Sequence, residues 1–99
     1  MKEQRIPVSP AWLDELKSGR KNFFVCETNP LYVELLTNCN KHETDAQVLY
    51  NNLVEYSKIV FYVPVLGGEY KASVDYYDIC KGTQIGLNNT NLYFVVFLK

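Results

Sequence analysis

Cysteine and histidine are scarce in this chain of 99 residues. The three cysteines, Cys26, Cys39 and Cys80, are an odd number and contain no Cys-x-x-Cys pair, so a disulfide framework is not expected and a reducing compartment is. Cys39 and the single histidine, His42, have the spacing of one half of a zinc site, but structural zinc sites normally combine two such pairs. The sequence therefore predicts no metal site. A catalytic Cys–His pair would have to use His42, which lies in a polar stretch between two predicted helices.

Long apolar runs and a strong excess of one charge are also lacking. The longest apolar run, Leu92–Leu98, has seven residues, whereas a membrane-spanning helix needs about 20. Residues 1–10 contain no apolar segment of the kind found in signal peptides. We therefore expect a cytoplasmic protein without a membrane partner. The formal net charge of −1 leaves only a local basic patch as a means of attracting nucleic acid.

Motifs for phosphate or dinucleotide binding do not occur. The pair Gly67-Gly68 lies between two predicted strands, whereas a phosphate loop leads into a helix. No nucleophile elbow is found, and acidic neighbours such as Asp14 and Glu15 are most simply solvated side chains. The sequence predicts no cofactor, and it leaves open whether the protein is an enzyme.

The composition is that of one small globular domain spanning residues 1–99. Hydrophobic residues make up 47% of the chain and charged residues 21%, which are ordinary globular values. Hydrophobic periodicity and turn residues predict a short strand, a helix, a strand, two helices and then three strands. The expected ranges are residues 6–8, 9–19, 22–27, 29–40, 44–56, 58–65, 70–77 and 92–98. Early helices and late strands predict an α+β fold with a small mixed or antiparallel sheet and two to three packed helices.

Several local signals set sharper expectations. Ser9 and Asn29 each precede a proline, which is the pattern of a helix N-cap followed by its first residue. Thr44 and the Gln that follows three residues later fit a capping box. Residues 80–91 are rich in Gly and Asn and are expected to form a loop. Leu92–Leu98 is apolar on both faces, so it is predicted to be a central strand.

One basic cluster stands beside aromatic residues. Lys17, Arg20 and Lys21 close the first predicted helix and lead into a strand that contains Phe24. Cations for phosphate and rings for stacking are what single-stranded nucleic acid requires of a binding surface. Alternatively, the cations only complement the negative end of the helix and the phenylalanines belong to the core. The pattern by itself favours this second interpretation.

A family resemblance adds to the first interpretation. Residues 6–25 (IPVSPAWLDELKSGRKNFFV) give a strand, a helix and a Gly-x-Lys segment that runs into a second strand. This opening resembles that of ASCH domains in the PUA-like superfamily. Residues 58–79 (KIVFYVPVLGGEYKASVDYYDI) resemble the family's barrel hairpin, and residues 91–99 (NLYFVVFLK) its closing strand. The resemblance implies a partly open PUA-like barrel that binds RNA or a modified nucleotide in a cleft beside residues 19–24.

The resemblance also implies roles for particular residues. Arg20 and Lys21 would contact phosphate, and Phe24 or a tyrosine would stack on a base. In the acetylcytidine amidohydrolases of this superfamily, a Lys and a Thr three residues later are catalytic. Lys21 matches that Lys, but Phe24 stands in place of the Thr and Cys26 in place of a common Arg. The sequence does not place the remaining catalytic carboxylate, so this chemistry is expected to be lost or changed, and catalytic residues stay unassigned.

A second class of function fits the same sequence. The chain is short, it contains eight tyrosines, and residues 22–57 carry one basic and five acidic side chains. These features are typical of a small protein-interaction module, such as an inhibitor from a phage or mobile element. Its partner protein would bind the Tyr-rich hairpin around Tyr70, Tyr76 and Tyr77.

Overall fold

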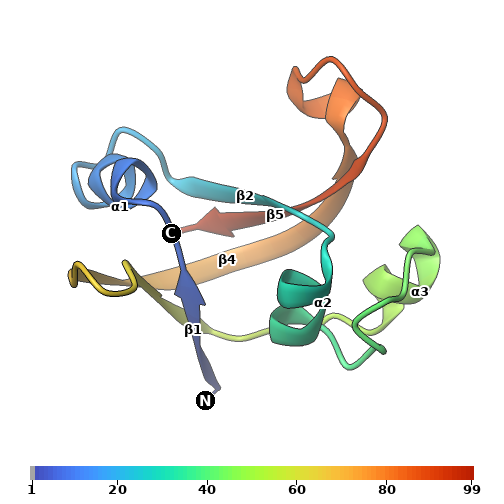
Figure 1. Ribbon diagram of the computed structural model, residues 1–99, viewed down its shortest axis with the longest axis horizontal. Coiled ribbons are helices and arrows are strands. Elements are labelled where there is room, and N and C mark those ends of the chain that lie inside the picture. The colour runs from blue at the N-terminus through green and yellow to red at the C-terminus, as the bar shows by residue number, and fades with distance from the viewer. Residues whose placement is uncertain (1) are drawn as a thin grey trace.

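The elements follow the predicted order (Figure 1). The structure is a computed structural model that describes residues 2–99. Its strands are β1 (Glu3–Pro7), β2 (Phe23–Glu27), β3 (Lys58–Tyr62), β4 (Glu69–Lys81) and β5 (Leu92–Leu98). Its helices are α1 (Pro10–Lys17), α2 (Pro30–Leu36), α3 (Ala46–Asn51) and the short 3₁₀ helix η1 (Gly82–Ile85). The α+β prediction is confirmed.

The five strands form one mixed sheet in the order β1-β3-β4-β5-β2. Only β1 and β3 are parallel, and the other three pairs are antiparallel. β5 pairs with β4 on one side and with β2 on the other, so its predicted central position is confirmed. Within residues 2–99 the end strands β1 and β2 do not pair with each other, so the sheet is not closed into a barrel.

The long strand β4 bends the sheet around the core. Its first part pairs with β3 and its second part with β5, and the register shifts between Val74 and Tyr76. Such a bulge bends a strand and increases its twist. In Figure 1, β4 accordingly crosses the whole molecule beneath β5 and β2. The bend places the two halves of the sheet on either side of a common core.

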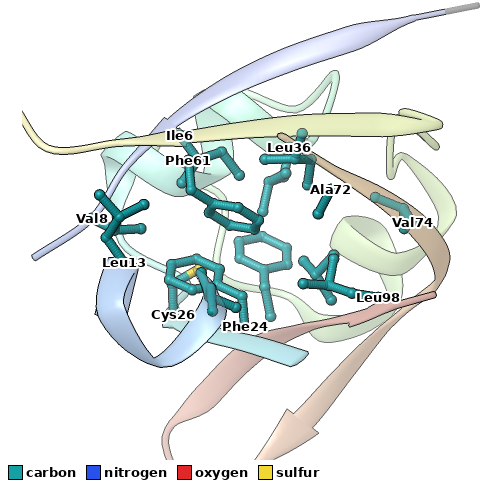
Figure 2. Packing of buried hydrophobic residues seen from close by; sticks show 14 of the residues in the cluster. Ile6, Val8, Leu13, Phe24, Cys26, Leu36, Phe61, Ala72, Val74 and Leu98 are labelled. Carbon is teal, nitrogen blue, oxygen red and sulfur yellow. The ribbon is translucent and has the colours of Figure 1, made fainter. Parts of the chain in front are cut away.

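Two of the helices, α1 and α2, lie at the opening between the two end strands (Figure 1). The hydroxyl of Tyr32 in α2 donates a hydrogen bond to the carbonyl of Pro7 at the end of β1 (3.2 Å). On the other side, Trp12 of α1 packs edge-on against Phe24 of β2, with ring centroids 5.1 Å apart. Figure 2 shows the side chains enclosed between these elements. Among residues 2–99 no helix has both the length and the apolar character that crossing a membrane requires.

Two helix starts are as predicted and one differs. The side chains of Ser9 and Asn29 accept hydrogen bonds from backbone N–H groups in the first turns of α1 and α2. The cap of α3, however, is Asp45 rather than Thr44, since its carboxylate accepts from two backbone N–H groups. The helix ends at Asn51 instead of near residue 56, because Leu53 leaves it to form a β-bridge with Thr37.

Strand boundaries also differ from the predicted ones. β1 spans Glu3–Pro7 rather than residues 6–8. β3 ends at Tyr62 rather than at residue 65, because Pro64 has no N–H for the ladder and Val65 has a positive φ of 68°. β4 continues to Lys81, so the first two residues of the predicted loop 80–91 pair with β5. The rest of that loop contains η1.

Candidate binding groove

The outer face of β2 and β5 carries a groove. Along β2, Phe24 and Cys26 turn into the core, so Phe23 and Val25 face the opposite side. Cross-strand pairs of β2 and β5 residues form the floor, and residues of α1, η1 and the following loop close its two ends. The volume is about 600 Å³. The lining residues, which together define the outer groove, are Trp12, Lys21, Phe23, Val25, Cys26, Glu27, Ile85, Leu87, Tyr93, Val95 and Phe97.

The floor consists of three pairs of facing residues. Phe23 faces Phe97, Val25 faces Val95, and Glu27 faces Tyr93. Side chains in such pairs touch across the strands, so they make one continuous surface. Because only Lys21 and Glu27 among the lining residues carry charge, the groove is apolar along its length and charged at two separated positions.

Lys21 and Trp12 form one end of the outer groove. The Nζ of Lys21 lies 4.6 Å from the centroid of the Trp12 ring and 5.9 Å from that of Phe23. A cation at this distance is attracted to the ring faces. The Lys21 N–H donates to the carbonyl of Glu15 (3.2 Å), which fixes the chain where α1 passes into β2. Lys21 takes part in none of the ion pairs found among residues 2–99.

The other two cations of the predicted cluster do not line the outer groove. Arg20 pairs with Asp14 and, through Nε, with Oε2 of Glu15 at 3.2 Å. The hydrogen bond that Arg20 donates to the Glu15 carboxylate raises the pKa of Arg20, which therefore stays charged but is locally balanced by two carboxylates. Lys17 lies in the last turn of α1 and lines a separate hollow of about 220 Å³ beside Leu66. The structure thus brings only Lys21 of the three to the groove.

Phe24 does not have the accessible position that base stacking requires. Its side chain is 2% exposed and packs against Trp12, Tyr32 and Phe61. A base cannot reach this ring while the core is intact, so burial speaks against Phe24, rather than a tyrosine, as the predicted stacking residue. The preceding residue, Phe23, faces the groove instead.

The tyrosines of the predicted hairpin surface also separate. Tyr70 and Tyr77 are half-buried and pack against the core. The Tyr77 hydroxyl donates to the carbonyl of Tyr56 (2.7 Å), and burial raises the pKa of Tyr77. Only Tyr76 is well exposed, at 53%. Its ring stacks on Phe97 with centroids 4.3 Å apart, so it extends the aromatic surface of the outer groove.

Cys26 and Cys80 belong to different strands, and Cys39 and His42 lie in the loop between α2 and α3. Cys26 is in the core, where burial raises the pKa of its thiol. Cys39 follows α2 and its Sγ contacts the carbonyl of Val48, while Cys80 belongs to β4. His42 is exposed in the loop before α3. In the part of the chain that the structure describes, no three side chains of His, Cys, Asp or Glu are grouped as metal ligands.

Sequence reasoning missed most of the outer groove. Phe97 comes from a run that is apolar on both faces, which predicts burial but does not show that this side chain stays partly exposed. Leu87 comes from the predicted loop. Comparison with protein-family models, with curated proteins and with solved structures finds no match to this chain. A functional assignment therefore depends on the groove itself.

Proposed function

We propose that this protein is a small interaction module that binds a partner protein through the outer groove. The observation that carries the proposal is the apolar floor, where Phe23, Val25 and Phe97 stay partly exposed over the buried side chain of Val95. Accessible apolar surface framed by polar residues marks interaction sites. The exposed ring of Tyr76 enlarges the surface with a residue type that is enriched at interfaces.

The charges near the groove support a protein partner over a polyanion. Binding to nucleic acid depends on several cations that neutralise phosphates. Here Arg20 already faces Asp14 and Glu15, and Lys21 is the one cation among the groove's lining residues. Glu27 adds a negative charge to the same groove. This balance suits a segment of protein with mixed polar and apolar side chains.

The experiment uses a library of random twelve-residue peptides displayed on phage. Peptides selected on the wild-type protein should lose binding to Leu87→Asp, which puts a carboxylate into the groove. Leu31→Asp is the matched control, because Leu31 is 48% exposed on α2 and Leu87 41% exposed at the groove. Trp12 is the only tryptophan, so its emission should shift when a selected peptide fills the groove. If no peptide is enriched, or if both variants bind equally, the proposal fails.

RNA or a modified nucleotide is the second candidate, in line with the ASCH resemblance. One specific observation favours it, namely the ammonium group of Lys21 held above Trp12 and beside Phe23. A cation next to accessible rings is the arrangement that binds single strands, with the base on a ring and the phosphate on the cation. Phe23 would then stack on the base in place of Phe24.

Titration with a single-stranded RNA at low salt, followed by Trp12 emission, tests this candidate. Lys21→Ala should weaken binding across sequences and lower the slope of log affinity against log salt by about 0.7, the value for one phosphate contact on a single strand. Lys41→Ala is the control, because Lys41 is exposed in the loop before α3 and does not line the groove. Undetectable binding at low salt, or equal slopes for the two variants, excludes the candidate. Acetylcytidine hydrolysis is not expected, because Phe24 has no hydroxyl nucleophile and is buried.

A further inference from the structure

The outer edge of β2 presents unpaired backbone groups. β2 is the last strand of the sheet, so within residues 2–99 it pairs with β5 alone. The N–H of Leu98 donates to the carbonyl of Asn22 (2.8 Å), and the N–H of Thr28 donates to the carbonyl of Leu92 (3.3 Å). In an antiparallel ladder, hydrogen-bonded pairs alternate with pairs whose N–H and C=O groups point away. The odd-numbered residues of β2 therefore turn these groups toward the free edge.

The free edge is accessible at Val25 and Glu27. Outside the strand ladders, none of the backbone hydrogen bonds found within residues 2–99 uses the N–H or C=O groups of these two residues. Cys26 lines the outer groove although its side chain is in the core, which means that the groove reaches the strand's backbone. Trp12 packs against both Phe23 and Phe24, so it covers the first part of the strand. The open part thus directly adjoins the apolar floor.

The opposite edge of the sheet is protected by comparison. In β1, Pro7 has no N–H to offer, and its carbonyl accepts from the hydroxyl of Tyr32. The Gln4 side chain also donates to the carbonyl of Leu35 in α2 (2.8 Å). β1 is therefore closed by α2, whereas no other segment within residues 2–99 makes such hydrogen bonds to Val25 or Glu27.

We infer that β2 receives an extended segment of the partner protein as a sixth strand. The inference rests on the proposed function and specifies how the partner binds. Only an extended chain presents donors and acceptors at the two-residue spacing of Val25 and Glu27. Alternate side chains of the added strand would continue the surface of Phe23 and Val25 across the groove face.

Charge specifies the segment further. Lys21 lies at one end of the exposed stretch and Glu27 at the other. A segment that carries an acidic residue opposite Lys21, an apolar residue over the floor and a basic residue opposite Glu27 complements all three positions. Like charges facing each other across strands would be unfavourable. For a given segment, the order of its acidic and basic residues therefore determines the direction in which it pairs with β2.

The decisive variant is Val25→Pro, tested with the tightest peptide selected from the random library. Proline removes an N–H that points to the free edge and leaves the bonds between β2 and β5 intact, and edge strands tolerate such prolines. Affinity should fall by at least about tenfold, because a backbone bond is lost and the ring obstructs the added strand. Val25→Thr keeps the N–H and a β-branched side chain, so it should bind within about threefold of wild type.

Hydrogen exchange on the wild-type complex gives a second measurement that does not depend on a variant folding. The amides of Val25 and Glu27 should become protected when the selected peptide binds, because they gain a partner. Those of Phe24 and Cys26, which face β5 already, should change little. The inference is overturned if Val25 and Glu27 gain no protection, or if a folded Val25→Pro variant binds as well as Val25→Thr.

The outcomes separate this inference from the proposed function. Peptides that are lost on Leu87→Asp but bind Val25→Pro normally would confirm the groove and exclude strand addition. A library that yields no groove-dependent peptide would overturn both. Selected peptides that bind as helices would likewise exclude strand addition, since a helix has no free backbone groups to pair with Val25.

Discussion

Phe23 and Phe24 are adjacent in the chain but face opposite sides of the sheet, so truncating each one gives a sharp test of the fold. Phe24 is 2% exposed and contacts three other aromatic rings. Phe24→Ala should lower the free energy of unfolding by about 3–5 kcal/mol, the usual cost of removing a buried ring and leaving a cavity. Phe23 is half-buried on the groove face, so Phe23→Ala should cost only about 1 kcal/mol.

Urea denaturation followed by Trp12 emission measures both variants, because Trp12 contacts both rings. In a separate thermal unfolding experiment, the melting temperature of Phe24→Ala should fall by more than about 12 °C, since a domain of this size loses about 4–8 °C per kcal/mol. The slope of the free energy of unfolding against urea concentration should not change if each variant still unfolds in one step. Equal costs for the two substitutions, or a larger cost at Phe23, would refute the assignment of Phe24 to the core.

Three further predictions concern other parts of the chain. Burial raises the pKa of Cys26 and of Tyr77, so the folded chain keeps protons that the unfolded chain releases. The free energy of unfolding should stay level below the unfolded thiol pKa of about 8.5 and fall at higher pH, by at most about 1.4 kcal/mol per pH unit for each group. In Cys26→Ala this fall should begin at a higher pH. A free energy that stays level to strongly alkaline pH would contradict the prediction. Val65→Gly should raise the free energy of unfolding by up to about 1 kcal/mol, because Val65 is fully exposed and its φ of 68° strains the backbone of a residue with a side chain. A lower free energy of unfolding in urea would contradict this. Gly82→Ala should cost more than about 1 kcal/mol, because the new Cβ would lie 2.7 Å from the carbonyl oxygen of Asn89, and unchanged thermal unfolding would show that the loop adapts.

Interactions between residues close in the sequence, together with the hydrophobic pattern, determined the order of the elements and several of their boundaries. Ser9 and Asn29 cap helices because their side chains accept hydrogen bonds from N–H groups a few residues away. Leu92–Leu98 is central because a run that is apolar on both faces gains most when strands and core cover it. These outcomes depend on interactions between near neighbours or on hydrophobicity alone, so the amino-acid order was sufficient.

Tertiary structure decided the candidate site. The run Phe23-Phe24-Val25-Cys26 is apolar at every position, so only pairing with β5 settles which side chains enter the core and which line the outer groove. Arg20 and Lys21 are equivalent as charges in the sequence, yet one faces two carboxylates and the other lies over Trp12, because α1 and the start of β2 present different surfaces to each. The free edge of β2 likewise exists only because β1 and β2 end the sheet without meeting. Register, side-chain environment and sheet closure arise from contacts between distant segments, and no local pattern encodes them.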